Sequence, residues 1–98
     1  MPGLIDSPEY AAAKTALGEA HPRFGDAVSA AEWELLAAHD VSGYPLVAQT
    51  ERGPVRSHQI EGSDGIPGIA VVFGVESYRG EEKLLLLDVW IVVESEDP

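Results

Sequence analysis

Three histidines, His21, His39 and His58, are the side chains best suited to acid–base chemistry near neutral pH. They lie far apart in the sequence, and none stands at a metal-binding spacing such as His-Glu-x-x-His. The chain has no cysteine, which excludes disulfides, thiolate metal sites and thiol nucleophiles. We therefore expect structural roles for the three histidines.

His58 has charged neighbours that could support catalysis. Arg56 stands two residues before it and Glu61 three residues after it, in a segment that alternates like a β-strand. Together they could form a polar group on a sheet, with His58 as acid or base. Such a combination is common by chance, so Arg56 and His58 are only candidate catalytic residues. The sequence favours a protein that is not an enzyme.

The glycine-rich loop at residues 62–68 does not predict a ligand site. It opens a strand and lacks the Lys-Ser/Thr pair that follows a phosphate-binding loop. Asp64 within it has no further acidic ligands at the spacing of a calcium loop. We expect no metal, no nucleotide and no other cofactor.

Asp88 interrupts the most apolar run of the chain, Leu84 to Val93. Strict alternation along a strand places it on one face with Trp90 and the two even-numbered leucines of the run. Burying an ionised carboxylate there without a partner would be costly, so this face should meet solvent or a partner. Asp88 is then either solvated or paired with Arg56 or Arg79, or it is an interface anchor that receives a partner's arginine.

A first helix is predicted over residues 8–20. Ser7 can cap its free amides, Pro8 tolerates the first helical position, and Glu9 suits the positive end of the helix dipole. The helix is expected to end near Ala20. Its many alanines leave a thin apolar face, so it should lie flat against a larger element.

A second helix is predicted to start at Ser29, because Ser29 and Glu32 form a Ser-x-x-Glu capping box. Val28 and Trp33 occupy the two positions of a hydrophobic staple. Trp33 is expected to face the core, and the helix should stop within residues 40–43.

The second half of the chain has the composition of β-strands, which we expect at residues 46–50, 55–60, 69–75 and 84–93. The segment 55–60 has no clean apolar face and should lie at a sheet edge. The predicted fold is α+β, with two N-terminal helices packed on a three- to four-stranded antiparallel sheet. Residues 1–98 form a single domain, with 1–6 as an N-terminal arm and 94–98 as an acidic tail.

The chain is strongly acidic, with 17 Asp and Glu residues against 6 Lys and Arg and a formal net charge of −11. This balance argues against direct nucleic-acid binding, which relies on basic side chains. A protein with a basic surface is the better complement, although acidity can also serve solubility alone. No segment reaches the roughly 18 apolar residues that span a bilayer, and no signal-peptide pattern opens the chain. We expect a cytoplasmic protein without membrane contact.

The predicted sheet has more apolar surface than two helices can cover. Runs such as 69–73 and 84–87 are apolar on both faces, so the second face should meet a protein partner or a second copy in a homodimer. The partner surface is expected to be basic or apolar. The predicted contact residues are Asp88, Trp90, Glu81, Glu82, Glu94 and Glu96.

Four segments follow one another in an order found in a known family: Gly43-Tyr44-Pro45-Leu46, Val55-Arg56, Ile69 to Phe73, and Leu84 to Val93. In this order residues 30–93 resemble the RelE/ParE toxin superfamily of toxin–antitoxin modules. The resemblance implies a helical pair followed by a sheet and the activity of an mRNA interferase or gyrase inhibitor. It leaves Arg56 and His58 as the candidate active residues.

The chain departs from that family at three points. The usual arginine of the second strand falls at Ala70, and the leading strand before the helices is missing or reduced to Gly3-Leu4-Ile5. Net acid replaces the family's basic surface. A ribosome-dependent RNase needs positive charge to hold RNA, so a shared shape would not carry that activity over.

The sequence favours a small acidic regulatory or inhibitory protein of the toxin–antitoxin or phage-defence kind, which acts through protein–protein contact. A variant of this hypothesis is a nucleic-acid mimic that occupies a basic groove. The alternatives are a RelE/ParE-like toxin and a scaffold domain of a larger assembly.

Overall fold

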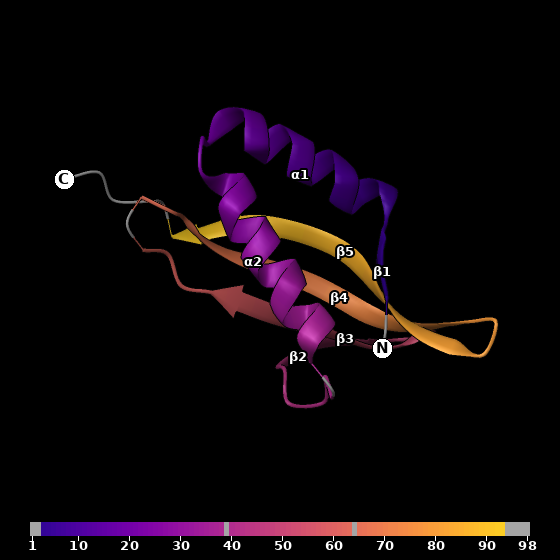
Figure 1. The fold of residues 1–98 in the computed structure, drawn as a ribbon. Helices are drawn as coiled ribbons and strands as arrows, with labels where there is room; N and C mark the ends of the chain where they lie inside the picture. The colour runs from indigo at the N-terminus through magenta and orange to yellow at the C-terminus, as the bar shows by residue number, and fades with distance from the viewer. Residues whose placement is uncertain (1–2, 39, 64, 94–98) are drawn as a thin grey trace.

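Two helices lie on one face of a single β-sheet in the computed structural model, which describes residues 3–38, 40–63 and 65–93 (Figure 1). The elements in chain order are β1 (Gly3–Asp6), α1 (Pro8–Ala20), α2 (Phe24–Ala37), β2 (Leu46–Thr50), β3 (Gly53–Ile60), β4 (Gly68–Tyr78) and β5 (Glu81–Val93). Both predicted helices and all four predicted strands are therefore present. No helix of the described residues is long and apolar enough to cross a membrane.

The sheet is mixed, and its five strands follow the order β1-β5-β4-β3-β2. β1 runs parallel to β5, and all other neighbours are antiparallel. The predicted α+β class is confirmed, but the sheet differs from the predicted three or four antiparallel strands because Gly3–Asp6 adds a parallel edge strand. Four residues are too few to show a recognisable period. β3 is internal, contrary to prediction, because β2 pairs with its outer edge.

Helix α1 begins where the sequence predicts, and its first turn is tied to the sheet. The Ser7 hydroxyl accepts a hydrogen bond from the Tyr10 N–H at 3.1 Å and donates one to the Leu87 carbonyl at 3.3 Å. The Ser7 N–H also donates to the Leu86 carbonyl at 3.0 Å. Since Ser7 is buried, the cap both starts the helix and fixes it to β5.

Helix α2 begins at Phe24, not at Ser29, so the predicted capping box lies inside the helix and caps nothing. Its buried side chains recur at helical spacing and are Phe24, Ala27, Val28, Ala31 and Leu35. Trp33 falls off this stripe and is 70% exposed, so its predicted core position is wrong. The alanines of the stripe are small, and they let the helix approach the sheet closely.

The core lies between the two helices and the inner face of β4 and β5. The sheet contributes Ile69, Val71, Phe73, Leu84, Leu86 and Val89, all of which are buried. The helices close this layer with Tyr10, Phe24 and Leu35, whose side chains are fully buried. Leu4 of β1 packs against the same cluster, which explains why the N-terminal segment joins the sheet.

Replacing Ser7 by alanine removes the helix cap and its bond to β5, and we expect this to lower the free energy of unfolding by about 1–2 kcal/mol. Ser29→Ala is the matched control. Ser29 is exposed within α2, and alanine favours helix, so this change should be neutral or stabilising by about 0.5 kcal/mol. Urea unfolding of both variants checks this. Equal losses would contradict the two assigned helix starts.

Candidate functional site

A β-bulge in β5 decides which side chains face away from the helices. Val72 pairs with Asp88 but Phe73 pairs with Leu86, so Leu87 is an extra residue without a partner in β4. The extra residue reverses the alternation from this point on. Asp88 therefore lies on the face opposite to Leu84 and Leu86, and the single face predicted from strict alternation is wrong.

The helix-free face is the side of the sheet that neither α1 nor α2 covers (Figure 1). The register, with the alternation of β5 next to its two unpaired residues Leu87 and Val92, assigns to it Val55, Ser57 and Gln59 of β3, Ala70, Val72, Gly74 and Glu76 of β4, and Glu81, Lys83, Leu85, Leu87, Asp88, Trp90 and Val92 of β5. Trp90 is 43% exposed and Val92 is 47% exposed. Large apolar side chains thus meet solvent on this face.

One end of the helix-free face is hollowed, with a volume of about 700 Å³. We call this space the hollow; it is lined by Thr50, Glu51, Arg52, Gly53, Pro54, Val55, Gly74, Val75, Glu76, Ser77, Leu85 and Leu87. Gly74 has no side chain and therefore leaves space on the floor of the hollow. A Cβ there would stand 3.8 Å from the Pro54 carbonyl oxygen and 4.0 Å from Leu87 Cδ1. Arg52 Nη1 and Glu76 Oε1 form an ion pair of 3.6 Å at the rim.

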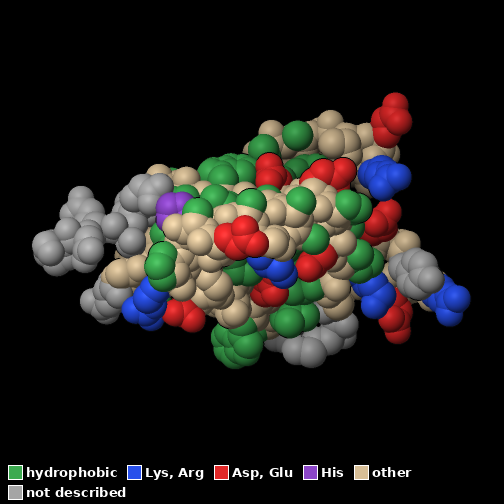
Figure 2. Space-filling model, turned by 90° about the horizontal axis from the view of Figure 1, so that it is seen from above, with side chains coloured by type: hydrophobic (Ala, Val, Ile, Leu, Met, Phe, Trp, Pro, Cys, Tyr) green, Lys and Arg blue, Asp and Glu red, His purple; other side chains and the backbone are tan. Residues whose placement is uncertain are grey.

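The helix-free face carries little of the net charge of the chain. Its strands carry one base, Lys83, and three acids, Glu76, Glu81 and Asp88. The rim of the hollow adds one base and one acid, Arg52 and Glu51. Most of the described acids therefore lie elsewhere. Figure 2 looks onto the side that carries α1 and shows acidic side chains spread over it. The predicted acidic surface and the predicted exposed sheet are thus two different surfaces.

The predicted contact residues are distributed over more than one place. Asp88, Trp90 and Glu81 share the helix-free face, and Glu81 Oε2 lies 4.0 Å from Lys83 Nζ. Glu82 pairs in register with Ser77, and alternation directs it to the opposite side. Glu94 and Glu96 lie outside the described residues.

Asp88 is exposed, which is one of the predicted alternatives, and it makes a local hydrogen bond, whereas Arg56 lies on the other face. Asp88 Oδ1 accepts from the N–H of Val89 at 2.8 Å. Arg56 lies on the helix side, paired in register with the buried Phe73. Because Asp88 is exposed, its carboxylate avoids the cost of burial.

His58 and Arg56 lie together on the helix side of β3, as their spacing predicts. His58 Nε2 is 2.9 Å from Glu34 Oε2 of α2, and its ring packs edge-on to Tyr44 with centroids 4.9 Å apart. The acidic group beside His58 is therefore Glu34 and not Glu61, as the sequence suggested. Glu61 is exposed and follows the end of β3. The contact ties the last turn of α2 to the sheet.

Arg56 organises the loop that leads into β2. Its Nη1 donates to the carbonyl of Tyr44 at 2.8 Å and to that of Ser42 at 3.2 Å. In the same loop the Ser42 N–H and hydroxyl both donate to Asp40, and these bonds, with the attraction of Arg56, lower the pKa of Asp40. These contacts give Arg56 a structural role.

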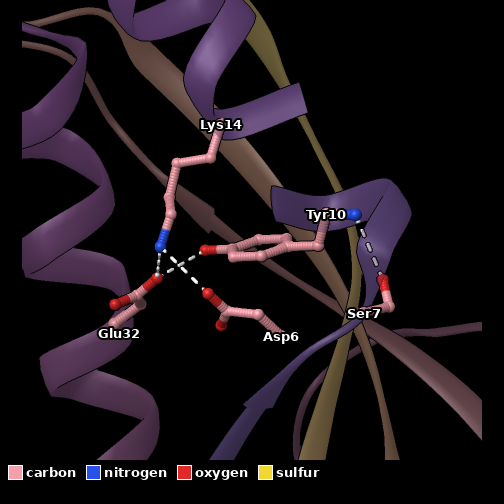
Figure 3. A network of polar contacts seen from close by, with 5 residues as sticks. All are labelled: Asp6, Ser7, Tyr10, Lys14 and Glu32. Atoms are coloured by element: carbon pink, nitrogen blue, oxygen red, sulfur yellow. Dashed lines mark hydrogen bonds and ion pairs between the residues drawn. The ribbon is translucent and has the colours of Figure 1, made fainter. Parts of the chain in front are cut away.

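A polar network that the sequence did not predict joins both helices to β1 (Figure 3). Tyr10 Oη donates to Glu32 Oε2 at 2.7 Å, and Lys14 Nζ lies 3.3 Å from the same oxygen and 3.2 Å from Asp6 Oδ2. Tyr10 and Lys14 are four residues apart on one helix face. The two carboxylates come from other elements, so sequence spacing alone could not reveal the network.

The network shifts the pKa of two members upward. Burial, the hydrogen bond to Glu32 and the nearby negative charges raise the pKa of Tyr10 far above its usual range. Burial opposes the charge of Lys14, but its hydrogen bonds and attraction to Asp6 and Glu32 outweigh burial and raise its pKa. Both protons are therefore held more tightly in the folded chain than in the unfolded chain.

The described residues contain no metal-ligand cluster, and known proteins give no further information on the site. Among residues 3–38, 40–63 and 65–93, no three His, Asp or Glu side chains gather as a metal site. Comparison with protein-family models, with characterised proteins and with solved structures gives no match.

Tyr10→Phe should lower the free energy of unfolding near pH 7 by about 1.5–3 kcal/mol, because a hydrogen bond to a charged group is lost. Above the ordinary tyrosine pKa of about 10, the unfolded chain releases the Tyr10 proton while the folded chain retains it. The stability of the parent protein should therefore fall as pH rises, and the fall should be smaller in the variant. Urea unfolding between pH 8 and pH 11 measures both effects. Parallel curves would contradict the network.

Proposed function

We propose that this chain is a small regulatory or inhibitory protein that acts by protein–protein contact, docking through the helix-free face onto an apolar, weakly charged surface. The exposure of Trp90 on a sheet face without helix cover carries this proposal. Tryptophan is enriched among the residues that dominate binding energy at interfaces. Ala70, its partner in register, and Val72 on the same face of β4 supply apolar neighbours.

The bulge at Leu87 supports a role for this exposure. An unbulged strand would direct Trp90 to the same face as Leu84 and Leu86, which are buried. Bulges commonly re-aim side chains next to functional sites. Here the bulge brings an aromatic side chain to the helix-free face while Val89 continues the core.

The charge distribution supports an apolar, weakly charged partner. A basic partner or a nucleic-acid mimic would require the acids to lie on the contact surface, whereas most of them lie away from the helix-free face. Contact through this face should therefore depend on apolar burial, which salt does not weaken. Direct nucleic-acid binding is disfavoured by the net charge of −11.

The candidate catalytic residues have structural partners. His58 is held by Glu34 and Tyr44, and Arg56 is bonded to two carbonyl groups. Their positions follow from packing α2 and the loop before β2 onto the sheet. This supports a binding protein over an enzyme.

Trp90→Ala should abolish specific capture of a partner from an extract of the native cell at about 0.5 M salt, because it removes the main apolar contact. Trp33→Ala is the matched control, since Trp33 is exposed on α2 and not on the helix-free face. Quantitative mass spectrometry of the captured proteins measures retention. Capture that survives Trp90→Ala, or that disappears at high salt with the parent chain, would contradict the proposal.

A RelE/ParE-like toxin is the second candidate, and β1 favours it. Gly3–Asp6 forms a strand ahead of the helical pair, and a strand at this place supports the candidate because that family has a leading strand before its helices. The net acid and Ala70 still argue against RNA cleavage.

Induced expression in a bacterial host tests this candidate, and we expect growth to continue unchanged. Growth arrest that His58→Gln relieves without changing the melting temperature would instead favour the toxin. His58→Gln is preferable to Arg56→Ala, since the latter also frees two carbonyl groups and disturbs the fold.

A further inference from the structure

We propose that the partner of the helix-free face is a second copy of this chain, stacked face to face about a two-fold axis so that Trp90 of each copy enters the hollow of the other. This inference rests on the proposed function, which makes that face the contact surface. It adds the identity of the partner and the arrangement of the two sheets.

The helix-free face carries a projection and a depression at opposite ends. Trp90 pairs in register with Ala70, whereas Gly74 lies in the floor of the hollow. Four residues of a strand separate these two positions of β4, or about 13 Å. A two-fold axis between the sheets, perpendicular to the strands and passing over Val72, would exchange them. In such an interface each copy supplies the same projection and the same depression.

The hollow is large enough to admit an indole ring. Its floor contains Val55, Gly74, Leu85 and Leu87, and its volume is about 700 Å³. The same rotation keeps β5 above β5 of the second copy, so Trp90 arrives over the Leu85 side of the hollow. An apolar ring leaving water for apolar walls gains the hydrophobic free energy that a stable interface needs.

The charged side chains around the face are also complementary under this rotation. Arg52 stands at the hollow end, where its side chain is 82% exposed. Glu61 follows β3 directly, at the end of the face that carries Trp90. The two-fold axis brings the Arg52 end of one copy over the Glu61 end of the other, so opposite charges meet at the rim.

Asp88 limits the strength of this dimer. It pairs with Val72, which lies under the axis, so the Asp88 carboxylates of two copies approach each other. The chain as a whole also carries −11, and the two copies repel at long range. Salt at 0.1 M largely screens the repulsion between charges that are more than about 10 Å apart. Association should therefore strengthen with salt, which is opposite to the behaviour of an acidic protein bound to a basic one.

Sedimentation of the full chain at about 0.05 M and 0.5 M salt tests the proposal. We expect a reversible monomer–dimer equilibrium that is tighter at high salt. Trp90→Ala should raise the dimer Kd by roughly 30-fold or more, as for a central interface residue, while Trp33→Ala should leave it unchanged. Asp88→Asn should lower the Kd by removing like charges from the axis.

A mixing experiment tests the arrangement itself. Gly74→Val places an isopropyl group on the floor of the hollow where the indole would rest, and the surroundings of Gly74 accept a Cβ without a close contact. Each variant alone loses both Trp90–hollow contacts: Trp90→Ala lacks the projection and Gly74→Val lacks the depression. A mixed dimer recovers one contact, between Trp90 of the Gly74→Val chain and the hollow of the Trp90→Ala chain. The mixture should thus associate more tightly than either variant alone.

The failures can be told apart. A parent chain that stays monomeric to about 1 mM, while Trp90→Ala still removes another salt-resistant partner, overturns the second copy and leaves the proposed function standing. A dimer that Trp90→Ala does not weaken, or variants whose mixture associates no better than each alone, overturns the stacking. A monomer without any Trp90-dependent partner overturns both.

Discussion

β5 carries two residues, Leu87 and Val92, that have no partner in β4, and the rest of the structure depends on how the first of them is accommodated. On one side of Leu87 the core receives Leu84 and Leu86, and on the other side it receives Val89. Without the extra residue, a strand of this length would place Asp88 and Trp90 under the helices. Burial of the Asp88 carboxylate would be costly there, and the large indole of Trp90 would prevent the helices from approaching the sheet closely.

The start of α1 is attached at this same point. Ser7 bonds to the carbonyls of Leu86 and Leu87, so the helix cap and the bulge share their hydrogen bonds. β1 then pairs with the part of β5 that precedes the bulge, and its last residue, Asp6, reaches Lys14. Tyr10 and Glu32 extend the connection to α2. The polar network therefore holds both helices on the inner face and leaves the outer face uncovered.

Much of the fold follows from local signals, and the errors have physical causes. The Ser7-Pro8 cap fixed the start of α1 because capping depends on residues near in sequence. The same reasoning failed at Ser29, since a capping box inside a longer helix has no free amides to satisfy. The stripe from Phe24 to Leu35 had helical period and was the better guide. Asp88 and Trp90 were singled out correctly as facing away from the core, but for the wrong reason, because no residue type marks a bulge in advance.

The site was only partly accessible to sequence reasoning because it depends on long-range pairing. The hollow brings together the β2–β3 turn, the second half of β4 and the first half of β5, which become neighbours only through strand pairing. Arg56 and His58 were recognisable as a pair on one strand, whereas their partners Glu34 and Tyr44 come from other elements. Contacts between distant segments leave no spacing in the chain.

The separation of charge from apolar surface follows from the two-layer design. One face of β4 and β5 is covered by α1 and α2, and most of the described acids occupy the helices and loops, where water is close. The other face keeps its apolar residues because its strands must still pair and twist as a sheet. A weakly charged surface with an exposed indole promotes aggregation unless charges elsewhere on the molecule keep other molecules away. The net charge of −11 supplies that repulsion, and an occupant of the helix-free face must gain enough apolar burial to overcome it.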